Sequence, residues 1–256
     1  MRYAILSDVH ATLFALRAVL GDAAGRYDQL LCLGDVVGYG AHPNECCALL
    51  RGAGARPVMG NHDAAALGQI DVEWFNEMAQ HSAMWTREVL SPDNWAWLGR
   101  AEETIEIRQG EDEPFLLTHG NLEEPFYETY ILNVGEAFAE FERLAQRGVR
   151  LCFFGHTHRA IAYRMAAPYS LQAPVQAMPL LQGGTLSFLQ NELWLVNPGS
   201  VGQPRDGNPQ ARYALFDAAR QEVEVRAVKY DIEAARHAII QAHLYVQLGD
   251  RLRTGR

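Results

Sequence analysis

The sequence predicts an α/β fold in which two β-sheets pack together and helices lie outside them. The first half of the chain alternates short apolar strands with amphipathic helices, whereas the half after residue 158 contains mainly strands with no helices between them. This order of elements is typical of layered α/β proteins. With 256 residues, 48% of them hydrophobic, the chain can fill a sizeable core, and no stretch reads as a linker. We therefore expect a single domain over residues 1–256.

Most strands expected in the first half are short apolar runs that end at a polar turn, whereas residues 104–107 alternate apolar and polar side chains. Proline at position 43 and the pair Ser91-Pro92 mark helix starts, because proline favours the first helical turn and serine caps it. The aromatic residues of stretch 74–98 are interpreted as core or interface packing. The expected strands are residues 3–6, 30–33, 57–59, 104–107, 115–118 and 151–154, and the expected helices are residues 13–23, a stretch from about 43, 74–98 with a break at 91–92, and 135–147.

The second half predicts a different order, with strands that follow one another directly. A Pro- and Gln-rich insertion, residues 166–184, interrupts these strands. A helix over residues 232–243 precedes a polar tail that we expect to be frayed. The expected strands are residues 160–165, 186–189, 193–196, 213–216 and 222–229.

The composition predicts a soluble cytoplasmic protein and disfavours two classes of partner. A formal net charge of −9 and a single lysine, Lys229, argue against binding nucleic acid through a broad basic surface. No apolar run approaches the about 20 residues that a membrane helix needs, and residues 2–6 look like a strand where a signal peptide would begin. The four cysteines have no metal-type spacing and fit small core residues in a reducing compartment.

Five polar motifs stand where five expected strands end. The apolar run 151–154, for example, is followed by Gly155-His156-Thr157-His158. One such pair of histidines could equally belong to a polar loop, but ligands of open α/β sheets collect beyond the carboxyl ends of strands, and all five motifs lie there. The polar strand-end residues are Asp8, His10, Asp35, Asn61, His62, His119, His156 and His158.

These side chains supply carboxylate, imidazole and amide-oxygen ligands and no thiolate. Such a set suits a borderline divalent ion such as Mn, Fe, Co, Ni or Zn rather than a structural zinc site. The ligands exceed the needs of one ion. Two ions about 3.5–4 Å apart would use them, with a carboxylate between the ions because its two oxygens can face different metals. The sequence therefore predicts two divalent metal ions per chain.

In this ordered set of motifs, the sequence resembles the calcineurin-like metallophosphoesterases over most of its length. The stretches Gly38-Tyr39-Gly40 and Asn197-Pro198-Gly199-Ser200 are similar to the small prokaryotic phosphodiesterase-like branch of that family. The resemblance implies a four-layer sandwich of two mixed β-sheets flanked by helices. The family motifs are here Asp8-Val9-His10, Gly34-Asp35, Gly60-Asn61-His62-Asp63, His119 and Gly155-His156-Thr157-His158.

The resemblance also implies a role for each motif residue. A hydroxide shared by two metals would attack phosphorus opposite the leaving alcohol, since coordination can lower the pKa of water to about 7. His62, which cannot easily bind the same metal as its neighbour Asn61, is implied to act as the catalytic residue at the phosphate and leaving group. One metal would be held by Asp8, His10 and His158, and the other by Asn61, His119 and His156, with Asp35 bridging the two.

Several further residues have both functional and structural interpretations. Arg205 could bind a phosphate if its loop folds over the metals, or lie in a solvated turn, and Tyr39 could line the cleft or pack against its loop. Asp63 is interpreted as a helix cap or as support for a ligand. At position 12, threonine replaces the asparagine common in the family. The isolated histidines, interpreted as surface or core residues, are His42, His81, His237 and His243.

We therefore predict a binuclear metal-dependent phosphoesterase that acts on a small phosphate ester, with Asn61, His62 and Arg205 binding the substrate. Phosphodiesters or small nucleotide-like compounds are expected first, and a phosphomonoesterase or protein phosphatase on the same site is the nearest alternative. A metal-binding scaffold of the same fold is a second alternative, disfavoured by the complete ligand set. A nuclease is a third, disfavoured by the acidic charge. Assembly into a homo-oligomer is compatible with the sequence.

Overall fold

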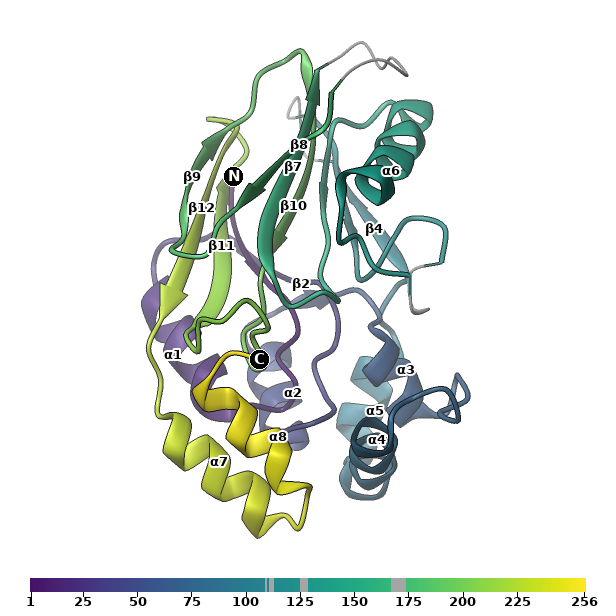
Figure 1. Cartoon of the computed structure of the whole chain (residues 1–256), viewed down its shortest axis with the longest axis vertical. Helices are drawn as coiled ribbons and strands as arrows, with labels where there is room; N and C mark the ends of the chain where they lie inside the picture. Colours follow the sequence, from purple (N-terminus) through teal and green to yellow (C-terminus); the bar gives the residue numbers. More distant parts are fainter. Residues whose placement is uncertain (109, 111–112, 125–128, 167–173) are drawn as a thin grey trace.

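Two six-stranded β-sheets lie side by side in the computed structural model, which describes residues 1–108, 110, 113–124, 129–166 and 174–256 (Figure 1). The first sheet has the order β3 (Arg56–Pro57), β2 (Gln29–Cys32), β1 (Arg2–Leu6), β11 (Ala211–Asp217), β12 (Glu222–Val228) and β9 (Gly184–Ser187). The second has the order β4 (Thr104–Ile107), β5 (Phe115–Thr118), β6 (Leu151–Phe153), β10 (Glu192–Pro198), β7 (Ala160–Ala166) and β8 (Gln176–Pro179). Strands β1, β2 and β3 are parallel, as are β5, β6 and β10, and the other pairs are antiparallel. The prediction of two packed mixed sheets is confirmed.

Helices cover the outer faces of the sheets and gather at one end of them (Figure 1). Their bounds are α1 (Leu13–Ala23), α2 (Pro43–Gly52), α3 (Asn61–Leu67), α4 (Glu77–Val89), α5 (Pro92–Leu98), α6 (Val134–Arg147), α7 (Ile232–Gln241) and α8 (Val246–Asp250), followed by a 3₁₀ turn at Arg251–Arg253. The break predicted at Ser91-Pro92 is confirmed, because Pro92 begins α5 and the Ser91 hydroxyl accepts a hydrogen bond from Asn94 N at 3.4 Å. Among the described residues, no helix combines the length and the apolar character needed to cross a membrane.

The alternation of side chains along each strand divides them between two cores. In β1, Tyr3 and Ile5 face the core between the sheets, whereas Ala4 and Leu6 face the core that includes α1. All four are buried, which explains why the strand is a continuous apolar run. Three rings from different strands meet between the sheets with centroids 5.2–5.8 Å apart: Phe115, Phe153 and Phe216.

Three sequence predictions about the fold are wrong. The segment after β3 forms helix α3, which the sequence did not predict, although Asp63 was interpreted as a possible helix cap. The insertion 166–184 contributes strand β8 and the first residue of β9 to the sheets, while its residues 167–173 lie outside the described residues. The tail after residue 243 is not frayed. It forms α8 and buries three leucines at helical spacing: Leu244, Leu248 and Leu252.

Candidate metal centre

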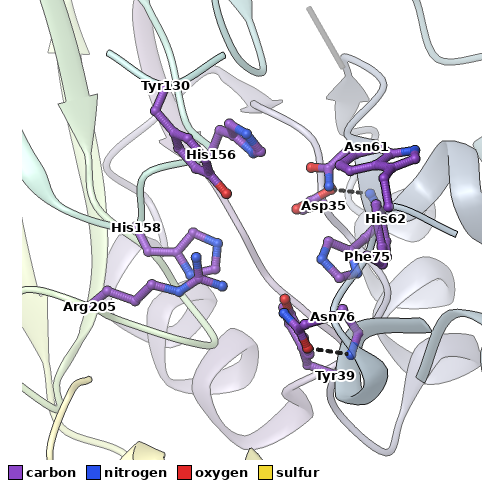
Figure 2. Close-up of a pocket in the computed structure, with 12 residues that line it drawn as sticks. Asp35, Tyr39, Asn61, His62, Phe75, Asn76, Tyr130, His156, His158 and Arg205 are labelled. Carbon is purple, nitrogen blue, oxygen red and sulfur yellow. Dashed lines mark hydrogen bonds between the residues drawn. The ribbon is translucent and has the colours of Figure 1, made fainter. Parts of the chain in front are cut away.

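The parallel strands of both sheets deliver the predicted residues to one place at the ends of the strands. Strands β1, β2 and β3 lead into the loops of the first three motifs, and β5 and β6 lead into the last two. Figure 2 shows Asp35, Asn61 and His62 facing His156 and His158 across the site. The structure brings all eight strand-end residues together, and none of them is more than 5% exposed, so the site is buried: Asp8, His10, Asp35, Asn61, His62, His119, His156 and His158.

One group of four donors could hold a metal ion: Asp8, His10, Asp35 and His158. The Nδ1 atoms of His10 and His158 lie 3.1 Å and 2.6 Å from the backbone carbonyls of Val37 and Gln203 and can donate to them. This arrangement places the lone pairs on the two Nε2 atoms, which lie 3.1 Å apart. Nε2 of His158 is also 3.3 Å from Oδ1 of Asp8. Electron pairs therefore converge on one point, as they do around a cation.

A second group of donors shares Asp35 with the first: Asp35, His119 and His156. Nδ1 of His119 can donate to the Leu33 carbonyl at 2.6 Å, which leaves its Nε2 facing Oδ1 of Asn61 at 3.1 Å. Oδ2 of Asp35 lies 3.5 Å from Nε2 of His10 and 3.4 Å from Nε2 of His119. The same carboxylate oxygen thus stands between the two groups.

Two atoms of these groups are buried without any hydrogen bond in the described structure: Oδ2 of Asp35 and Nε2 of His156. A buried polar atom without a partner is costly, so each such atom calls for an explanation. A divalent cation would satisfy both atoms, and carboxylate and imidazole donors suit ions such as Mn, Fe, Co, Ni or Zn. The residues present therefore fit metal binding in both groups.

Burial and neighbouring charges together set the charge states of the donors. It raises the pKa of Asp8 to about 7, and it would raise the pKa of Asp35, but the charge of the neighbouring His119 holds that pKa well below its usual value. Neutral imidazole is the form that binds metals. Burial lowers the pKa of three imidazoles well below the usual value and so keeps them neutral near pH 7: His10, His156 and His158.

The loops hold most of the carboxylate and imidazole donors in left-handed backbone conformations. The φ angles of Asp8, His10, Asp35, His156 and His158 lie between 46° and 63°. This region is sterically unfavourable for residues other than glycine, by about 1–3 kcal/mol each, and persists only where the surroundings enforce it. Backbone hydrogen bonds provide that enforcement: Asp8 N donates to the Gly34 carbonyl at 3.1 Å and His10 N to the Asp35 carbonyl at 2.9 Å.

Side chains of the Asn197–Ser200 stretch fix two of these loops to each other. Nδ2 of Asn197 donates to the Gly155 carbonyl at 2.7 Å and to Oγ1 of Thr157 at 3.0 Å. Oγ of Ser200 donates to the Asp8 carbonyl at 2.8 Å. The stretch therefore ties the loop after β6 to the loop after β1.

Asp63 and Thr12 also support the backbone of the site. Asp63 accepts hydrogen bonds from Gly60 N at 3.2 Å and from Val37 N at 3.0 Å, which confirms its interpretation as a helix cap. The Thr12 hydroxyl donates to the His10 carbonyl at 3.1 Å. Threonine at this position thus still contributes a hydrogen bond at the edge of the first donor group.

Gly60→Ala is expected to destabilise the protein by about 1–3 kcal/mol, the usual cost of overpacking a dense interior. A Cβ at residue 60 would overlap with the backbone nitrogen and Oδ1 of Asp35. Chemical denaturation followed by circular dichroism measures the effect. Gly52→Ala in α2 is the matched control, because a Cβ there meets nothing within 4 Å, and it is expected to leave stability unchanged or raise it by about 0.5–1 kcal/mol. Equal stability of both variants would contradict this account.

A small pocket of about 50 Å³ opens onto the donor groups. Its wall includes aromatic residues that precede α4, Trp74 and Phe75, which we expected to serve core or interface packing. Phe75 is buried in a hydrophobic cluster against which Trp74 packs, as expected, and it also reaches the site, because its ring centroid is 4.9 Å from that of His62. The sequence also gave no signal for Tyr130, whose ring stacks on His156 at 4.2 Å (Figure 2). Tyr39 does line the cleft.

His62 lies beside the donor groups without belonging to either of them. Its ring packs between Tyr39, at 4.3 Å, and Phe75, and its backbone nitrogen donates to Oδ1 of Asp35 at 2.8 Å. Nδ1 of the ring is buried and has no hydrogen-bond partner in the described structure. Burial lowers the pKa of His62 to about 4, so the ring is neutral near pH 7.

Arg205 lies at the edge of the pocket beside His158 (Figure 2). Its backbone nitrogen donates to the His158 carbonyl at 3.1 Å, and its guanidinium donates to Oε1 of Gln203 at 2.9 Å. The guanidinium carbon is 5.9 Å from the centre of the Tyr39 ring. Of the isolated histidines, His42 contacts the ring of Phe14 and His81 that of Tyr245, and neither lines the pocket.

Comparisons with known proteins agree with this geometry. A family model for the calcineurin-like phosphoesterase superfamily domain matches residues 1–221. An uncharacterized protein of Methanocaldococcus jannaschii is 35% identical over 254 residues, which cover 99% of this chain and 98% of that protein. The crystal structure of a metallophosphoesterase from Sphaerobacter thermophilus is 35% identical, with a TM-score of 0.83 and 100% coverage of both chains.

The fold extends to a more distant protein as well. The crystal structure of a hypothetical protein from Pyrococcus horikoshii OT3 is 17% identical, has a TM-score of 0.76 and covers 100% of this chain and 98% of its own. The matched residues 1–221 contain all five metal-site motifs. The chain therefore belongs to the calcineurin-like phosphoesterase superfamily.

Proposed function

We propose that this chain hydrolyses small phosphodiesters with the help of two divalent metal ions. The observation that carries the proposal is the position of the buried Oδ2 of Asp35, which lies 3.5 Å from Nε2 of His10 in one donor group and 3.4 Å from Nε2 of His119 in the other. One carboxylate oxygen facing two sets of imidazoles suits a bridging ligand. Action in the cytoplasm as a single domain over residues 1–256 is part of the same proposal.

Each donor group would hold one ion. Two bound ions would supply a hydroxide nucleophile at neutral pH and positive charge for the phosphate oxygens. Besides Asp35, which both ions would share, the first ion would be held by Asp8, His10 and His158 and the second by Asn61, His119 and His156.

The remaining polar side chains of the pocket would orient the substrate. Arg205 presents a planar guanidinium that can pair with two phosphate oxygens. The amide nitrogen of Asn61 can donate to a further oxygen. His62, whose ring lines the pocket, would contact the phosphoryl group or the leaving oxygen.

Aromatic side chains favour a diester over a monoester. Trp74, Phe75 and Tyr130 line the pocket together with Tyr39, so aromatic rings stand beside a phosphate site whose exposed surface is otherwise mainly polar. A phosphodiester carries an organic group on each side of phosphorus, and both groups can pack against such rings. A monoester would leave one side of the phosphate to polar contacts alone.

Metal-replete protein is expected to bind about two ions per chain and to cleave bis(p-nitrophenyl) phosphate faster than p-nitrophenyl phosphate. Elemental analysis gives the metal content, and nitrophenolate absorbance gives the rates with Mn, Fe, Co, Ni and Zn. EDTA should abolish the activity, because coordination generates the nucleophile. The background control is the double variant Asp8→Ala with Asp35→Ala.

Three results would count against the proposal in different ways. One ion per chain, with His119→Ala and His156→Ala leaving metal content and activity unchanged, would contradict the use of two ions. A faster rate on the monoester would assign a phosphomonoesterase. Turnover no higher than that of the double variant with every metal would favour a metal-binding scaffold.

A further inference from the structure

A second, larger pocket adjoins the metal centre. Its volume is about 750 Å³, compared with about 50 Å³ for the pocket over the donor groups. Arg205 lines both pockets, which places them side by side. Four arginines from three parts of the chain line the larger one, here called the arginine pocket: Arg159, Arg205, Arg251 and Arg256.

The positive charge of the arginine pocket is not neutralised by neighbouring acidic side chains. Among the described residues, no ion pair involves Arg159, Arg205 or Arg251. The one acid in the lining, Asp206, has a side chain that is only 1% exposed and faces the buried guanidinium of Arg212 at 3.8 Å. The chain as a whole carries a net charge of −9, so this cluster is a local exception.

Two of these arginines are close enough to repel each other. The pKa of Arg251 is lowered by burial and, after that, by the charge of Arg205. Partly buried like charges are unfavourable until an anion lies near both of them. Nε of Arg251 donates at 2.6 Å to an oxygen of Arg256, which is part of a carboxylate in the 256-residue chain, and Arg205 donates to Gln203. Other N–H groups of each guanidinium remain available for an anion.

The fold holds the C-terminal segment in place beside the loop of Arg205. Gly207 N donates to the Gly255 carbonyl at 2.8 Å. Leu248 and Leu252, on either side of Arg251, are buried among the helices. The C-terminus consequently lies near the strand ends that carry the metal centre (Figure 1). The arginine pocket is therefore built by tertiary packing of the C-terminal segment.

The small pocket over the donor groups has room for only a few groups of the size of water, so most of a substrate must lie outside it. We propose that the arginine pocket binds a second anionic group of the substrate, and that the preferred substrate is a phosphate ester that carries another phosphate beyond the one that is cleaved. This inference rests on the proposed function. Guanidinium groups match phosphate oxygens in geometry and charge. The apolar residues Ile161, Pro179 and Leu181 give the connecting organic group a surface to pack on.

Two substrates with the same leaving group test the proposal: the p-nitrophenyl ester of thymidine 5′-phosphate, and the same ester with an added 3′-phosphate. For the metal-replete protein, kcat/KM is expected to be at least about 10-fold higher for the substrate with the 3′-phosphate, the gain expected from charge-assisted hydrogen bonds. In Arg159→Gln and Arg251→Gln, this ratio should fall toward one. All rates are measured at one ionic strength, because salt screens such contacts.

Arg253→Gln is the matched control. Arg253 lies two residues from Arg251, donates to Glu233 at 2.6–2.7 Å and does not line the arginine pocket, so its variant should keep the wild-type ratio. A ratio near one in the wild type, or a ratio that Arg159→Gln and Arg251→Gln leave unchanged, would overturn the inference. Cleavage of the ester without the 3′-phosphate would in that case leave the proposed function standing.

Calorimetric titration of the metal-free protein separates the two proposals. Thymidine 3′,5′-bisphosphate is expected to bind at least about 10-fold more tightly than thymidine 5′-phosphate, and Arg251→Gln should remove the difference. This measurement tests the arginine pocket even if no ester is turned over. Equal affinities would overturn the inference. Binding of inorganic pyrophosphate that depends on Arg251, without any gain from the 3′-phosphate, would assign the pocket to a free anion and overturn it as well.

Discussion

Asp35→Asn is expected to reduce kcat/KM by at least about 10²–10³-fold, the range typical of losing one preorganised electrostatic group. The Asp35 carboxylate is the donor common to both groups, and the variant loses a negative charge between them. Metal affinity should fall in both groups, so elemental analysis should find fewer ions per chain than in the wild type. No other single change of a donor residue should be as damaging.

The same variant should still fold without metal. In the metal-free protein, Asp35 adds like charge to two other buried carboxyls, and burial together with that charge raises the pKa values of Asp8 and Asp63 to about 7. Removal of the charge relieves this repulsion, so the circular dichroism spectrum of the metal-free variant should match that of the wild type. Asp93→Asn, an exposed change in the first turn of α5, is the control and should keep both metals and activity. Wild-type metal content in Asp35→Asn would contradict the bridging role.

His62→Ala is expected to lose about 10²–10⁴-fold in kcat on an alkyl or nucleoside phosphodiester and much less on a nitrophenyl diester. A poor leaving group needs a proton as it departs, whereas nitrophenolate is stable as an anion. The neutral, buried ring can donate a hydrogen bond at once, and the charge of a bound phosphate favours its protonated form. Steady-state rates on the two substrates provide the comparison.

Metal content should stay at the wild-type level in His62→Ala, because His62 belongs to neither donor group. His81→Ala is the matched control: His81 contacts Tyr245 away from the pocket, and its loss should change neither rate. An equal loss on both substrates would assign His62 to phosphate binding rather than proton donation. Loss of metal would show that His62 is a ligand.

The metal donors could be predicted from the sequence because each is local to a strand end. A short apolar run followed by glycine and a carboxylate or imidazole is visible along the chain, and parallel strands bring such ends to one edge. The pocket wall could not be predicted in this way. Phe75 reaches His62 because the segment before α4 lines the pocket, and Tyr130 reaches His156 from a loop after β5. Neither approach leaves a periodic pattern in the sequence.

The prediction of a frayed C-terminal segment is wrong for a related reason. Its polar composition suggested a frayed end, but Leu244, Leu248 and Leu252 recur at intervals of four residues and form one apolar stripe. Three apolar residues at helical spacing are too few to predict a buried helix unless the surface on which they pack is known. That surface is made by the neighbouring helix α7 and by α4, which is more than 150 residues earlier in the chain. The arginine pocket depends on this packing and was likewise invisible in the sequence.

The pairing of β1 with β11 has a consequence for the order in which the protein can be made. Arg2 pairs with Asp217 and Ile5 with Ala214, so β1 is synthesised more than 200 residues before its partner β11. Contacts between such distant segments form late, because a long loop must close first. Ser200 and Gly202 then hold the backbone of Asp8 through hydrogen bonds to its carbonyl. A nascent chain or fragment that ends before residue 200 would thus contain every metal donor. It would lack the two hydrogen bonds from Ser200 and Gly202 that help to hold Asp8 in its left-handed conformation.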